Sequence, residues 1–145
     1  MKINWMAALT SAAAILGSWI SFAFGGLDGM LWTLLAFMAA DYITGIVVAA
    51  VFHKSNKSES GALNSEAGWQ GLVKKGGVLL VVLVAAALDR VLGTDAIRDG
   101  AVLAFLVNET VSLIENAGLM GVPIPAALQK AIEVLRDRSE SGDTQ

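Results

Sequence analysis

Hydrophobic residues along the chain are gathered into four long runs, and short polar segments separate them. A helix needs about 20 apolar residues to cross a hydrocarbon core of about 30 Å. Three runs meet this requirement, at residues 5–24, 30–52 and 101–120, and a shorter one reaches it when extended to 72–92. We predict a transmembrane helix over each of the four. The chain is therefore expected to be an all-α integral membrane protein with about four transmembrane helices.

Glycine and proline mark the ends of these runs. A glycine-rich turn, Gly25 to Gly29, should join the first two helices as a hairpin, and Pro123 and Pro125 end the fourth. Apolar residues then recur at helical spacing, which predicts a short amphipathic helix over 126–138 and a polar tail over 139–145.

Two of the four runs leave an alternative open. The first could be a cleaved signal peptide, because Lys2 precedes it and Ser21-Phe22-Ala23 is an acceptable cleavage site. We favour a retained helix, because the apolar run is longer than the core of a signal peptide usually is. The third lacks charge only from Gly76 to Leu88, so it is either a short span or a half-buried segment.

Composition supports a membrane protein and excludes several functions. Charged residues make up 16% of the chain against about 25% in soluble domains. Its 145 residues are expected to form a single membrane domain, 1–145. With no cysteine and one histidine, neither a catalytic triad nor a zinc site can be assembled, so we expect a non-enzyme with no cofactor. A net charge of -3 argues against nucleic-acid binding.

The basic residues predict an orientation. A four-span arrangement with a cytoplasmic N-terminus leaves only Arg90 and Arg98 outside. The other basic residues then lie in the cytoplasm, namely Lys2, Lys54, Lys57, Lys74, Lys75, Lys130, Arg136 and Arg138. This is the distribution that the positive-inside rule describes, so both termini are expected in the cytoplasm. Asp89 and Arg90 are expected to pair or to reach the outer interface.

Asp41 is an acidic residue in the middle of the second predicted span, and Thr44 and Gly45 follow it on the same face. An ionised acid at the centre of a lone helix costs about 2.5 to 3.5 kcal/mol, so Asp41 should face a partner or water. It either makes a structural hydrogen bond or takes part in a pore or its assembly.

The fourth predicted span carries a broad polar face, made by Asn108, Glu109, Ser112, Glu115 and Asn116. Two central acids would cost about 5 to 7 kcal/mol, more than the about 3 to 5 kcal/mol that its apolar residues contribute. Other helices, other protomers or a water-filled lumen must therefore shelter this helix. A pore or an assembly role is one interpretation and a structural polar core is the other.

Small residues form a stripe along the first predicted helix, chiefly Ser11, Ala14, Ser18 and Ser21. Such a stripe lets another helix backbone approach closely. We expect it to serve helix packing, either within one chain or between protomers.

Three blocks resemble a known family. They are Asp41-Tyr42-Ile43-Thr44-Gly45, the segment from Ser65 to Lys75, and the polar pairs Asn108-Glu109 and Glu115-Asn116 followed by Gly121-Val122-Pro123-Ile124-Pro125. Their order and spacing resemble the toxin secretion and phage lysis holin family, which includes phage holins and clostridial toxin-export holins.

The resemblance implies a homo-oligomer in the lipid of the bacterial host's cytoplasmic membrane. There it would form pores or lesions that release an endolysin or a toxin and permit lysis. The alternatives are a small ion or metabolite channel, a transporter subunit, or a passive scaffold for another membrane protein.

Overall fold

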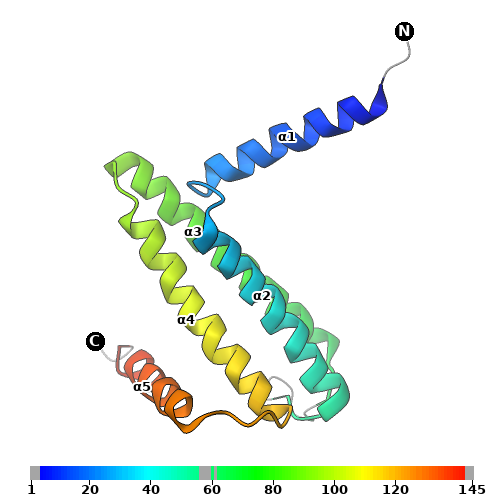
Figure 1. Cartoon of the computed structure of the whole chain (residues 1–145), viewed down its shortest axis with the longest axis vertical. Helices are drawn as coiled ribbons and strands as arrows, with labels where there is room; N and C mark the ends of the chain where they lie inside the picture. The colour runs from blue at the N-terminus through cyan, green and yellow to red at the C-terminus, as the bar shows by residue number, and fades with distance from the viewer. Residues whose placement is uncertain (1–3, 56–59, 61, 143–145) are drawn as a thin grey trace. The chain divides into compact units, whose positions relative to one another are not determined.

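The computed structural model describes residues 4–55, 60 and 62–142, and all regular structure within them is helical (Figure 1). The helices are α1 (Trp5–Ala23), α2 (Gly29–Val47), the π-helical turn η1 (Val48–Phe52), α3 (Ser65–Leu92), α4 (Ala96–Leu119) and α5 (Ala126–Gly142). By length and composition, α1, α2 with η1, α3 and α4 can each cross a membrane. The predicted fold class, four apolar spans and a C-terminal helix, is confirmed.

The third and fourth helices begin before the predicted residues 72 and 101. Asn64 caps α3, because its Oδ1 accepts the backbone N–H of Glu66 at 2.9 Å. With 28 residues, α3 is about 42 Å long, enough to exceed the hydrocarbon core of about 30 Å. In the same way, the Asp89 carboxylate of α3 accepts backbone N–H groups at the start of α4.

The last helix extends beyond residue 138, so part of the predicted polar tail is helical as far as Gly142. A helix once nucleated gains one hydrogen bond for each residue added, which explains why polar residues can continue it. Residues 143–145 of that tail lie outside the described residues, as do Lys2 and Lys57 from the count of cytoplasmic basic residues.

The helices contribute to two compact units, Met1–Ala36 with Val73–Leu106 and Phe37–Leu72 with Val107–Gln145. Buried side chains of the first unit are mostly apolar, namely Leu31, Leu34, Val82, Ala85, Ala86 and Val102, with Asp89 and Arg98 beside them. The second unit buries Met38, Val48 and Ala49 together with the polar residues Asp41, Glu109 and Asn116. One membrane domain over 1–145 stays a prediction.

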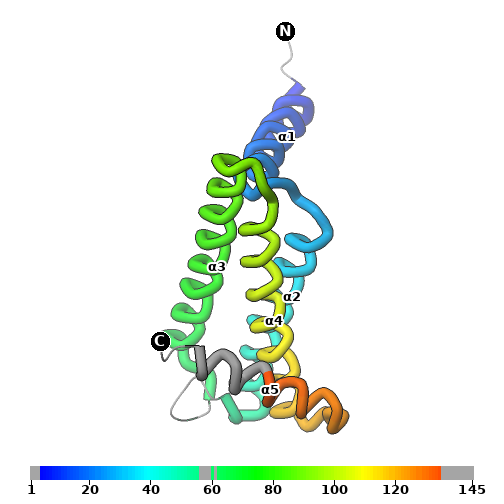
Figure 2. Tube along the Cα trace, turned by 90° about the vertical axis from the view of Figure 1, so that its left-hand side faces the viewer, coloured from blue at the N-terminus to red at the C-terminus, as the bar shows by residue number. Residues whose placement is uncertain are grey.

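Two turns shape the first unit. The predicted turn between α1 and α2 contains Gly25 and Gly26 at φ values of 74° and 118°, which side chains rarely tolerate. Asp28 then caps α2 by accepting the N–H of Leu31 at 2.9 Å. Between α3 and α4 the chain turns back over residues 93–95 (Figure 2), where Gly93 has a φ of 69°.

Candidate functional site

Asp41 of α2 lies against α4 in the second unit, and its side chain is buried with only 4% of the residue exposed. Its Oδ1 accepts a hydrogen bond from the Ser112 hydroxyl and another, at 3.0 Å, from the Asn116 amide. Hydrogen bonds of this kind offset the cost of burying a carboxyl group. The structure therefore brings Asp41 of the second predicted span together with Ser112 and Asn116 of the fourth.

Thr44 completes this group. The Asn116 amide also donates to the Thr44 hydroxyl at 3.0 Å, and that hydroxyl in turn donates to the backbone carbonyl of Ala40 at 2.8 Å. Gly45 lies beside the same amide, since a Cβ built there would be 3.9 Å from Asn116 Nδ2. We call Asp41, Thr44, Ser112 and Asn116 the Asp41 cluster; its hydrogen bonds join α2 to α4.

The polar face predicted on the fourth span is divided between two environments. Asn116 and Glu109 are buried, with 6% and 9% of the residue exposed, whereas Asn108 and Glu115 are exposed. Asn108 and Glu115 are seven residues apart, so they lie on one side of α4. One edge of the face, with Ser112 and Asn116, bonds to Asp41 and joins α4 to α2. The other edge, with Asn108 and Glu115, is exposed.

The stripe on α1 is uncovered within its unit. None of the described residues of α1 is buried, and Ser11, Ala14 and Ser18 are exposed while Ser21 is partly covered. A shallow hollow on this helix is lined by Ala14, Ile15, Ser18, Trp19 and Phe22. The small residues thus form an open, mostly apolar surface.

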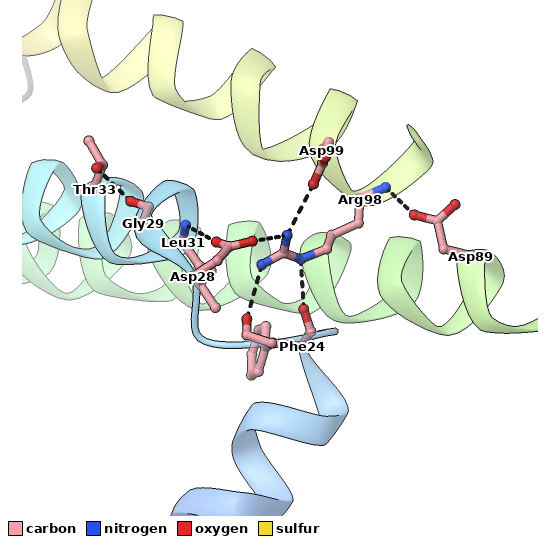
Figure 3. A network of polar contacts seen from close by, with 9 residues as sticks. Phe24, Asp28, Gly29, Leu31, Thr33, Asp89, Arg98 and Asp99 are labelled. Atoms are coloured by element: carbon pink, nitrogen blue, oxygen red, sulfur yellow. Dashed lines mark hydrogen bonds and ion pairs between the residues drawn. The ribbon is translucent and has the colours of Figure 1, made fainter. Parts of the chain in front are cut away.

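A second polar network, which the sequence did not predict, surrounds Arg98 in the first unit (Figure 3). Only 5% of its side chain is exposed. The guanidinium donates to Asp28 Oδ2 at 2.6 Å, to Asp99 Oδ1 at 3.0 Å, and to the carbonyls of Phe24 and Gly26 at 2.8 and 3.0 Å. One side chain of α4 thereby holds the turn that joins α1 to α2.

Asp89, near the end of α3, binds the start of α4. Its two carboxylate oxygens accept the N–H of Ile97 at 3.2 Å and the N–H of Arg98 at 2.7 Å, and it also accepts the Thr94 hydroxyl. The first N–H groups of a helix have no intrahelical partner and favour a negative charge. Asp89 is therefore an N-terminal cap supplied by the preceding helix.

Arg90 of α3 binds the C-terminal end of α1. Its guanidinium donates to the carbonyls of Phe22 and Ala23 and lies 4.6 Å from the centroid of the Phe22 ring. The last carbonyls of a helix favour a positive charge. The sequence offered one signal for this role, because Arg90 and Arg98 are the two basic residues that the predicted orientation leaves outside.

Asp28 lies in the turn between α1 and α2, and its side chain is 47% exposed. The hydrogen bond from Arg98 lowers the pKa of this carboxyl below its ordinary value of 3.8. Partial burial opposes the shift, while the N–H of Leu31 and the charge of Arg98 support it. Asp28 is consequently ionised at neutral pH and paired with Arg98.

The chain is similar to known proteins over most of its length. The model of the bacteriophage holin family matches residues 18–137. The chain is 39% identical to an uncharacterised 14.9 kDa protein in the nagH 3′ region of Clostridium perfringens, over 85% of this chain and 89% of that protein. It is 37% identical to an uncharacterised protein of Halalkalibacterium halodurans, over 90% and 95% of the two chains. No solved structure matches.

Proposed function

Because the chain belongs to the bacteriophage holin family, we propose that it is a holin that assembles in the bacterial cytoplasmic membrane and opens lesions. An endolysin or an exported toxin would pass through these lesions. The family and the four apolar helices together favour a non-enzymatic membrane protein.

The observation that carries this proposal is the exposure of Asn108 on α4. Hydrocarbon offers no hydrogen-bond partner to the Asn108 amide at the middle of α4, and leaving a primary amide unpaired there is costly. The outer edge of α4 should therefore face another protomer or a water-filled lumen. Assembly around this edge would supply both.

The Asp41 cluster supports a division of roles among the polar residues. Asp41, Thr44, Ser112 and Asn116 bond to one another inside one chain, so we assign them to holding α2 against α4. Gly45 lies beside them and Glu109 is buried. The candidates for contacting another protomer or lining a lesion narrow to Asn108 and Glu115.

Inducible expression in bacteria with a membrane-potential dye tests this function. Expression should collapse the potential abruptly, and lysis should follow only when an endolysin is co-expressed. Conductance in defined steps without cell death would instead indicate a channel or transporter subunit, and an unchanged potential would indicate a scaffold. Either result would contradict the holin assignment.

A substitution at Glu115 tests whether this residue takes part in the lesion. Glu115→Leu should reach the membrane at the normal level, because leucine inserts into a membrane more favourably than an acid, yet it should delay or abolish the loss of potential. The matched control is Ile43→Leu, which alters an exposed apolar residue of α2 in the same unit and should keep normal timing. Normal timing in Glu115→Leu would remove this residue from the lesion.

A further inference from the structure

We propose that Asn108 is the contact through which α4 of one chain pairs with α4 of a second copy. The inference rests on the proposed assembly and names the surface that makes it. The surface consists of Asn108, Val111, Glu115 and Gly118, which recur at spacings of three and four residues and so share one side of the helix. We call it the outer face of α4.

The depth of Asn108 in the membrane is the first reason. α4 has 24 residues from Ala96 to Leu119, and Asn108 lies at its middle, about 17 Å from either end. A span of this length puts the middle of the helix at the centre of the hydrocarbon layer, far from water and lipid headgroups.

The second reason is hydrogen bonding. The Asn108 side chain is exposed, and within residues 4–55, 60 and 62–142 it makes no hydrogen bond. A primary amide offers two donors and one carbonyl acceptor, and leaving them unpaired in hydrocarbon is costly. None of those described residues supplies a partner, and a second copy of the chain can do so.

The third reason is that α4 is held in this rotation. Ser112 and Asn116, on the neighbouring edge, bond to Asp41 and so fix which side of α4 meets α2. Turning Asn108 inward would break those bonds. Rotation of the helix therefore cannot relieve the exposed amide.

A second copy fits this surface in chemistry and in shape. An amide both donates and accepts, so Asn108 of one chain complements Asn108 of another across a symmetric interface. Polar side chains of this kind bond between transmembrane helices, and small residues such as Gly118 permit close backbone approach. Lipid would satisfy neither the donors nor the acceptor.

Cysteine cross-linking in intact membranes tests the surface directly, because the natural sequence contains no cysteine. Val111→Cys, at the centre of the outer face, should form a disulfide-linked dimer under mild oxidation. Ile43→Cys, on an exposed apolar position of α2, should give little dimer. Equal dimer from both variants would overturn the assigned surface.

Substitution of the amide provides the energetic test. In measurements of self-association in lipid vesicles, Asn108→Ala should weaken association by about 3- to 30-fold, the range for one hydrogen bond between membrane helices. Asn108→Gln, which keeps the amide, should restore most of it, and Ile43→Ala should leave it unchanged. Association of Asn108→Ala at the normal strength would contradict the role of Asn108.

Combined with the dye experiment, these results separate the two proposals. Loss of membrane potential without a Val111→Cys dimer would reject the outer face and leave the holin function standing. A dimer without loss of potential would support the interface and reject the function. A disulfide within one chain carrying both Ser18→Cys and Val111→Cys would show that α1 covers the face, and would overturn pairing through α4.

Discussion

At the scale of residues, Arg98 connects several otherwise separate groups in the first unit. Two carboxylates and two backbone carbonyls accept hydrogen bonds from its guanidinium, and its own N–H is bound by Asp89. Charge-assisted bonds of this kind are stronger than neutral ones, and a nearly buried arginine is well suited to making them. The turn between α1 and α2 thus depends on one side chain of α4.

Replacing Arg98 should expose that dependence. Arg98→Gln should lower the free energy of unfolding in detergent by about 2 to 3 kcal/mol, because carbonyls of the turn lose their donors and Asp28 loses its ion pair. Asp99→Asn, with a 43% exposed side chain, should cost less than about 1 kcal/mol. Equal stability of the two variants in a denaturant titration would argue against the network.

The same pair predicts a dependence on pH. Because Arg98 lowers the pKa of Asp28, the contribution of the pair is complete above the ordinary value of 3.8 and is lost as the pH falls through the lower pKa of the folded protein. Arg98→Gln should therefore lose less stability than the natural chain does below about pH 4.

At the scale of elements, α1 differs from the other apolar helices. It buries no residue within its unit, while the carbonyls at its C-terminal end and in the turn that follows are held by Arg90 and Arg98. A transmembrane helix gains little from apolar contact alone, since lipid is equally apolar. The small residues along α1 are thus suited to close packing with another helix.

A size change on this stripe tests the packing. Ser18→Leu should weaken assembly because the larger side chain prevents close backbone approach, whereas Ile15→Leu nearly conserves volume in the same hollow and should have little effect. Chemical cross-linking in membranes would measure both. Identical ladders from the two variants and the natural chain would remove the stripe from assembly.

At the scale of the whole molecule, the distribution of charge governs the predicted orientation. Two of the ten basic residues, Arg90 and Arg98, fall on the outer side in that arrangement. Both are bound to the end of α1 or the turn that follows it, so each has a structural reason for its position. Basic residues on the outer side count against the predicted orientation under the positive-inside rule. Because Arg90 and Arg98 are placed there by these bonds, they do not argue against cytoplasmic termini.

Thiol labelling of intact cells tests the orientation. Cysteines introduced at Ser60 and Glu133 should resist an impermeant reagent before lysis, and a cysteine at Asp95, in the turn between α3 and α4, should react. Labelling after the cells are opened provides the control for reactivity. Protection at Asp95 or labelling at Ser60 would overturn the four-span orientation.

The sequence by itself determined the class of the fold and the places where the chain turns. Long apolar runs can form only helices in a membrane, because every backbone polar group must find a partner within its own segment. Glycines and prolines then mark where helices end, as Gly25, Gly26 and Pro123 do here. Polar residues inside the runs also indicated that Asp41 and the fourth span need partners other than lipid.

Only the tertiary structure decided which of those polar residues meet. Helical spacing put Asn108, Ser112 and Glu115 on one face, yet Ser112 bonds to Asp41 while Asn108 and Glu115 are exposed. Periodicity gives the angle of a residue around its own helix and says nothing about which neighbour occupies that angle. The partners of Arg98 could not be predicted for the same reason. Two of its acceptors are backbone carbonyls that folding brings near, and every residue has such a carbonyl, so the sequence does not distinguish them.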